Sequence, residues 1–188
     1  IIELGQADAL IIATSHTIQR LVVDQWHIIG DIYDRGPHPD LIVDQLTQLP
    51  AVDVQWGNHD ILWFGAASGS ELCLLNLLRI CARYNNLAII EETYGIDLTD
   101  LVRFAAQHYQ ANSAFMPVED PNQGPLTRAE KLKISQVQQA LAIMQFKLEL
   151  TVIKRHPEFN MDHRLLLSQV DFKRRILHLN GQEYPLEN

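Results

Sequence analysis

Two short apolar runs, each ending in a glycine-bearing polar motif, constrain the fold of this chain more than any other feature. Residues 25–30 (QWHIIG) lead into GDIYDRG at 30–36, and residues 52–56 (VDVQW) lead into GNHD at 57–60. Short apolar runs bounded by glycine are typical of buried strands. Each motif is therefore predicted to be a loop at the end of a strand.

The segment between the two motifs carries the pattern of a helix. Residues 39–49 open with proline, place an aspartate in the first turn, repeat apolar residues at helical spacing and stop before Pro50. A strand, helix and strand in this order form a right-handed crossover with parallel strands. We therefore expect an α/β fold in which Asp31 and Asn58 emerge at the same edge of a sheet, where ligand sites of α/β proteins gather.

The residues expected at this edge suit a two-metal phosphate ester hydrolase. The carboxylate of Asp31 can bridge two divalent ions roughly 3.5–4 Å apart, which together activate a water molecule. Asn58 offers a neutral oxygen ligand through its side-chain carbonyl. We therefore expect Asp31 and Asn58 to be metal ligands.

Three further residues of the motifs suit proton transfer and phosphate binding. His59 is the natural proton donor to a leaving alkoxide, and Asp34 is the candidate carboxylate that holds its imidazole in place. Arg35 carries a planar guanidinium suited to bidentate contact with phosphate oxygens. Either motif alone is a weak signal, but both together across one crossover indicate a catalytic site.

GDIYDRG followed by GNHD resembles the calcineurin-like metallophosphoesterases, in particular the serine/threonine protein phosphatase branch. The resemblance is closer to the class III fructose-1,6-bisphosphatases of low-GC Gram-positive bacteria and extends along the whole chain. The segments that carry it include IIELGQAD, HTIQRLVVD, VQWGNHDILW, GAASGS, RICARYNNL, IIEETYGI, AIMQFKLE, KRHPEFNM and DHRLLL.

This resemblance implies an activity and a role for each site residue. The activity is hydrolysis of the 1-phosphate of fructose 1,6-bisphosphate in gluconeogenesis, by a cytoplasmic enzyme that uses Mn²⁺. Asp31 would bridge the metals, Asn58 would bind the second metal, and Arg35 would contact phosphate. His59 would be the acid, with Asp34 as its partner. The implied fold is part of a calcineurin-like metallophosphoesterase sandwich.

The chain lacks other parts of the family pattern. No DxH motif precedes Gly30, and no GHxH or GHTP motif follows Asp60. The remaining histidines lie outside any such motif, so we interpret them as surface or packing residues: His16, His27, His38, His108, His156, His163 and His178. We therefore expect this chain to be an internal fragment of a longer enzyme, with an incomplete metal site of its own.

Three other functions remain open. A protein phosphatase or a dinucleotide polyphosphate hydrolase shares the same strand-end motifs, although the helices expected after GNHD speak against both. A non-catalytic interaction fragment would fit the missing motifs.

The rest of the chain predicts a helical insert and a C-terminal hairpin. We expect a partial metallophosphoesterase core at 1–65, a helical insert at 66–168 and a β-hairpin at 169–188. The hairpin turns at Asn180-Gly181, a pair typical of type I′ turns. The expected helices are 6–23, 61–84 with a break at 68–70, 99–110 capped by Thr99, and 127–150 opened by a Thr127–Glu130 capping box, with a linker at 114–125.

Composition limits the partners. A net charge of −8 argues against nucleic acid, and no apolar run is long enough to span a bilayer. Cys73 and Cys81 are expected in one helix about 12 Å apart, too far for a disulfide, which fits the cytoplasm. The expected partners are a sugar bisphosphate substrate and either a second copy or the missing parts of the parent chain.

Overall fold

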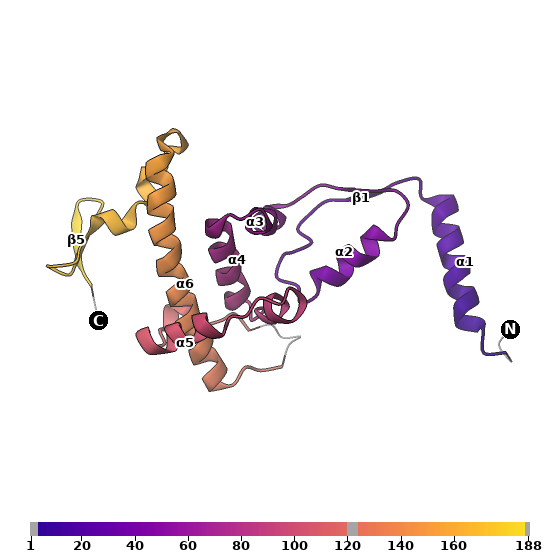
Figure 1. Ribbon diagram of the computed structural model, residues 1–188, viewed down its shortest axis with the longest axis horizontal. Helices are drawn as coiled ribbons and strands as arrows, with labels where there is room; N and C mark the ends of the chain where they lie inside the picture. The colour runs from indigo at the N-terminus through magenta and orange to yellow at the C-terminus, as the bar shows by residue number, and fades with distance from the viewer. Residues whose placement is uncertain (1–3, 120–123, 187–188) are drawn as a thin grey trace. The chain divides into compact units, whose positions relative to one another are not determined.

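The structure is a computed structural model that describes residues 4–119 and 124–186 (Figure 1). The fold is α/β and mostly helical, with two small sheets. The chain divides into two compact units, Ile1–Ile61 and Leu62–Asn188, and each is described by itself. The domain boundaries expected after residues 65 and 168 stay predictions.

The first unit contains the predicted crossover. Its elements are α1 (Ala7–Val22), β1 (Trp26–Ile28), α2 (Pro39–Thr47) and β2 (Val52–Val54). The two strands pair in parallel, with Trp26 opposite Val52 and Ile28 opposite Val54. The strand, helix and strand order and the parallel pairing are therefore confirmed.

The strands of this sheet are shorter and less buried than predicted. Each ends two residues before its predicted end, at Ile28 and Val54. Ile29, which follows β1, is 84% exposed, and Val54 is also exposed. The expectation of buried strands is therefore wrong for this chain. The physical reason is that, among the described residues, this sheet contains only two strands. No further strand therefore lies beside β1 or β2.

The GNHD motif begins a helix and is not only a loop. Helix α3 (Asn58–Ala67) starts at the asparagine, so Asn58, His59 and Asp60 form its first turn. The predicted break follows it, and α4 (Glu71–Arg83) begins after Ser70, whose hydroxyl accepts a hydrogen bond from the Cys73 N–H at 3.3 Å.

The second unit has a helical core. Helix α4 packs against α6 (Arg128–Arg155), which also contacts α5 (Thr99–His108), and Figure 1 shows α4 beside α6. A π-helix at Ile89–Thr93 lies between α4 and α5 in the chain. The core is built by Leu77, Leu78, Cys81, Ala82, Ile89, Ile90, Leu98, Ala105, Ile134, Val137, Ala140 and Leu141. Apolar burial of this kind is the main term that stabilises the unit.

Helix α6 begins with the predicted capping box. The Glu130 N–H donates to the Thr127 hydroxyl at 3.3 Å, and the Thr127 N–H donates to the Glu130 carboxylate at 2.7 Å. The Thr127 hydroxyl, which donates to the Glu130 carboxylate at 2.7 Å, and the Thr127 N–H together hold the pKa of Glu130 below its usual value. The helix continues to Arg155, five residues beyond its predicted end.

The predicted cap of α5 is wrong. Thr99 is the first helical residue and Leu98 is the N-cap, without a side-chain hydrogen bond to the helix. Instead the Thr99 N–H donates to the carboxylate of Asp97 at 2.8 Å, and hydrogen bonding to Thr99 lowers the pKa of Asp97. Asp is favoured two residues before such an N–H group, because its carboxylate can accept a hydrogen bond from the backbone N–H two residues later. The helix ends at His108, two residues early.

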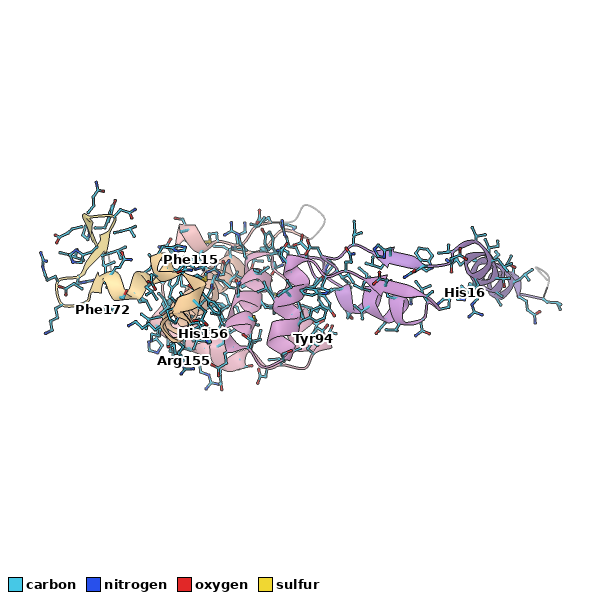
Figure 2. All side chains as sticks on the ribbon, turned by 90° about the horizontal axis from the view of Figure 1, so that it is seen from above. His16, Tyr94, Phe115, Arg155, His156 and Phe172 are labelled. Atoms are coloured by element: carbon cyan, nitrogen blue, oxygen red, sulfur yellow. The ribbon has the colours of Figure 1, made fainter. Side chains whose placement is uncertain are left out.

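The segment expected to be a linker is tied into the second unit. The 3₁₀ turn Ser113–Phe115 opens it, and Figure 2 labels Phe115. The Phe115 carbonyl accepts from Gln138 Nε2 at 3.0 Å. The Val118 N–H donates to the Arg83 carbonyl at 2.7 Å. The linker prediction is therefore wrong for the described residues 114–119; residues 120–123 lie outside them.

The chain ends in a small antiparallel sheet. After three 3₁₀ turns (Pro157–Phe159, Asp162–Arg164 and Leu166–Gln169) come β3 (Val170–Asp171), β4 (Ile176–Leu179) and β5 (Gln182–Pro185). Asn180 and Gly181 have φ of 52° and 77°, which confirms the predicted turn with two left-handed residues. Strand β3 was not predicted.

Both cysteines lie in α4 and neither forms a disulfide. Burial raises the pKa of the Cys81 thiol to about 12, so this thiol stays protonated and unreactive. Among the described residues, no helix has the length and apolar character needed to cross a membrane.

Candidate functional site

The parallel crossover brings the two motifs together within the first unit. Gly30 and Asp31 follow β1, and Gly57 and α3 follow β2. The His59 N–H, in the first turn of α3, donates to Asp31 Oδ1 at 3.1 Å. A carboxylate at the start of a helix satisfies an otherwise unpaired N–H and interacts favourably with the helix dipole.

Two glycines allow this close approach. A Cβ on Gly30 would lie 2.5 Å from the backbone nitrogen of Gly57, and a Cβ on Gly57 would overlap the carboxylate of Asp31. Gly30 also has φ of 90°, a conformation that side chains rarely adopt. Only glycine at both positions lets the two strand ends meet with the Asp31 carboxylate between them.

Asp31 itself has a left-handed backbone, with φ of 53°, and so does Arg35, with φ of 63°. Non-glycine residues adopt this region at a cost, and such residues cluster at functional sites. The conformation at Asp31 needs a compensating interaction, which its backbone N–H provides through Asp60.

Asp34, Arg35 and His59 form one connected group. His59 Nε2 lies 3.1 Å from Asp34 Oδ1, and Arg35 Nε donates to the same oxygen at 2.7 Å. The His59 side chain is 16% exposed and that of Arg35 is 50% exposed. Because a carboxylate only accepts hydrogen bonds, the Asp34 contact fixes the proton on Nε2. The structure thus brings these three residues together, while their catalytic roles stay predictions.

The donors that a metal would need are present only in part. Asp31 supplies a carboxylate, and Asn58 supplies a side-chain carbonyl on an exposed residue at the start of α3. Oxygen donors of this kind suit hard divalent ions and Mn²⁺. The described part of the chain contains no group of three or more His, Cys, Asp or Glu side chains placed to hold a metal. The chemistry of these two donors fits a metal ion, and their roles as metal ligands stay predictions.

Asp60 was not predicted as a site residue from the sequence. Its side chain is buried, with 2% exposed, and accepts three backbone hydrogen bonds. Oδ2 accepts from the N–H groups of Asp31 at 2.7 Å and Gly57 at 2.8 Å, and Oδ1 accepts from the Tyr33 N–H at 3.0 Å. The signal that could have indicated it is the last letter of GNHD, an acidic residue in the first turn of a helix.

Comparison with known proteins gives one consistent family. The family described as Firmicute fructose-1,6-bisphosphatase matches residues 1–188. The chain is 98% identical over 188 residues to a protein of Latilactobacillus sakei subsp. sakei (strain 23K) called fructose-1,6-bisphosphatase class 3. Proteins of the same description from Ligilactobacillus salivarius (strain UCC118) and Oceanobacillus iheyensis are 57% and 53% identical over 188 residues.

These relatives are much longer than the chain. All 188 residues match, but they cover 29% of the length of each of these three proteins. No solved structure matches the chain. The similarity therefore concerns a segment of a longer protein, and that segment contains both motifs.

Proposed function

Because this chain belongs to the Firmicute fructose-1,6-bisphosphatase family, we propose that the longer protein hydrolyses a phosphate monoester of fructose 1,6-bisphosphate and that residues 1–188 contribute part of its active site. The observation that carries the proposal is the group at the strand ends, where Asp31 contacts the helix that bears His59 and Asp34 holds the His59 imidazole. We propose that this reaction belongs to gluconeogenesis, as the resemblance to the class III enzymes implies.

The proposed reaction is attack of water on phosphorus. An oxygen–phosphorus bond to water forms, the bond from phosphorus to the sugar oxygen breaks, and the products are inorganic phosphate and a fructose monophosphate. The leaving sugar oxygen needs a proton, and we assign its donation to His59. With Nε2–H held by Asp34, Nδ1 would face the leaving group, and it would donate its proton from the imidazolium form, in which both ring nitrogens carry a proton. General acid catalysis of this kind contributes about 10²–10⁴-fold.

Arg35 is proposed to contact the phosphate. Its guanidinium is half exposed, and its Nε is fixed by Asp34. Fixing one nitrogen orients the plane of the guanidinium and lowers the conformational entropy that binding would otherwise remove. Arg35 and His59 then share one carboxylate, so phosphate binding and proton donation depend on the position of Asp34.

Asp31 and Asn58 are proposed to be ligands of divalent ions, with Mn²⁺ as the metal. When bound, such ions supply the Lewis acidity that activates water and stabilises charge on the phosphoryl oxygens. We propose that further ligands come from other parts of the longer protein, because the described residues contain no group of three or more His, Cys, Asp or Glu side chains placed to hold a metal. The relatives' length leaves room for such ligands.

The rest of the longer polypeptide is proposed to complete the calcineurin-like sandwich. Parallel sheets are found with both faces covered, whereas the first unit exposes apolar residues on its helices and beside its strands. The exposed apolar residues include Ile11, Ile12, Leu21, Ile29, Leu41, Ile42 and Trp56. Further strands of the same polypeptide would cover them, and a second copy is the alternative cover. We propose a cytoplasmic location, consistent with two free cysteines.

The other candidate functions are less well supported. The strand-end motifs handle a phosphoryl group and metals, so they do not distinguish a sugar bisphosphate from a phosphoprotein or a dinucleotide polyphosphate. The three relatives named above are described as fructose-1,6-bisphosphatase, which favours the sugar bisphosphate. A non-catalytic role fits only the isolated chain.

The proposal is tested by comparing the isolated 188-residue chain with the full-length protein. The full-length protein with Mn²⁺ is expected to release phosphate from fructose 1,6-bisphosphate, and a chelator should abolish the release. The isolated chain is expected to bind at most one divalent ion weakly and to release phosphate no faster than background, because its ligand set is incomplete. Released phosphate and calorimetric metal titration give the answer. Absence of turnover by the full-length protein would refute the function, and robust turnover by the isolated chain would refute the incomplete site.

A further inference from the structure

The carboxylate of Asp60 joins the two strand-end loops of the first unit. It accepts hydrogen bonds from Asp31 and Tyr33, which belong to the first motif, and from Gly57, which precedes α3. These partners lie 29, 27 and 3 residues away in the chain. In return, Asp31 Oδ1 accepts from the His59 N–H of α3. Each loop therefore supplies a carboxylate to the backbone of the other.

This arrangement is that of an anion bound by backbone N–H groups. Gly30 and Asp31 both have left-handed backbones, and the N–H groups of Asp31 and Tyr33 converge on one carboxylate. Successive N–H groups in such conformations form concave anion sites. Here the protein's own Asp60 occupies the site. Buried carboxylates are stable only when hydrogen-bonded, and the three N–H donors meet that need.

The structure assigns to Asp60 the role of a positioning residue for the proposed hydrolysis, an inference that rests on the proposed function. Its carboxylate holds Asp31 in the left-handed conformation and fixes the distance between the Asp31 carboxylate and the first turn of α3. Asn58 and His59 lie in that turn. Asp60 does not touch substrate; it sets where a metal ligand and the proton donor stand relative to each other.

Two variants of the full-length protein separate the three hydrogen bonds. Asp60→Ala removes all of them. Asp60→Asn keeps a carbonyl oxygen for the N–H groups of Asp31 and Gly57, but turns an NH₂ group toward the Tyr33 N–H. The matched control is Asp44→Asn, an exposed aspartate of α2 in the same unit, which is expected to leave all readouts unchanged.

The first readout is amide hydrogen exchange without metal or substrate. We expect Asp60→Ala to speed exchange in peptides that cover residues 30–36 and 56–59, and Asp60→Asn to speed it in the first peptide only. Wild-type exchange in both variants would overturn the assignment. Because this readout does not use activity, it is informative even when the proposed function fails.

The second readout is turnover with Mn²⁺. Loss of a group that orients metal ligands costs about 10–100-fold in metal affinity or activity, so Asp60→Ala should lose kcat and Mn²⁺ affinity in that range with a smaller change in KM. Formate carries a carboxylate that fits the space left by Asp60→Ala, so formate should restore part of kcat while chloride at equal ionic strength should not. Wild-type kcat and Mn²⁺ affinity in Asp60→Ala would overturn the role.

If Asp60→Ala does not fold, Asp60→Asn is measured instead. We expect this variant to lose less kcat and Mn²⁺ affinity than Asp60→Ala, and wild-type values of both in Asp60→Asn would contradict the role of Asp60. Altered exchange together with an inactive wild-type protein would instead refute only the proposed function.

Discussion

Asp31→Asn in the full-length protein is expected to lose bound metal and to lower kcat for fructose 1,6-bisphosphate by about 10³-fold or more. An amide cannot bridge two cations as a carboxylate does, and a metal ion supplies several kcal/mol of transition-state stabilisation, where each ~1.4 kcal/mol is a factor of ten. The Asp31 backbone conformation and its contact with the Gly57 region should survive, because the substitution keeps the side-chain shape.

Phosphate release and metal content measured on the same preparation check this prediction. Asp44→Asn again serves as the control, because this substitution removes the same negative charge from an exposed side chain elsewhere in the first unit. A variant at Asp31 that retains near-wild-type turnover and metal content would show that Asp31 only caps α3 through its contact with the His59 N–H.

The second large effect is expected at His59. His59→Asn should reduce turnover of the sugar bisphosphate by about 10²–10⁴-fold, as expected for a general acid. An activated aryl phosphate needs no proton on its leaving group, so its turnover should fall much less. Asp34→Asn should reduce turnover of the sugar bisphosphate while leaving metal content intact, because Asp34 contacts His59 and Arg35.

A comparison of kcat on both substrates separates acid catalysis from a general loss of structure. His178→Asn, on the partly exposed surface of β4, is the matched control. Equal losses on the two substrates in His59→Asn would argue that His59 is not the proton donor. Metal loss in Asp34→Asn would argue that Asp34 is a ligand.

The parts of the fold that were predicted correctly depend on signals within a few residues. Pro39 begins α2, Thr127 and Glu130 form the capping box of α6, and Asn180-Gly181 forms the turn between β4 and β5. Each depends on hydrogen bonds or backbone preferences of neighbouring residues, which a single sequence displays directly.

The parts that were missed depend on competing or distant partners. Thr99 does not cap α5 because Asp97, two residues earlier, accepts its N–H. Burial of β1 was predicted from its apolar residues. Burial also depends on neighbouring strands, and β2 is the only strand that pairs with β1 among the described residues. Asp60 was missed because its carboxylate is paired with N–H groups of Asp31 and Tyr33, far along the chain. The sequence predicted that Asp31, Asn58 and His59 lie at the same edge of the sheet. It did not predict the hydrogen bonds of Asp60 that join the two loops.

We propose above that Asp31 and Asn58 of this chain are ligands of the catalytic metals. The most direct test is anomalous scattering at the manganese edge, measured on crystals of the full-length protein with Mn²⁺. We expect two manganese peaks about 3.5–4 Å apart, with the Asp31 carboxylate in contact with both and the Asn58 carbonyl in contact with one. Manganese peaks away from Asp31 and Asn58, or full occupancy by metals that neither residue touches, would contradict it.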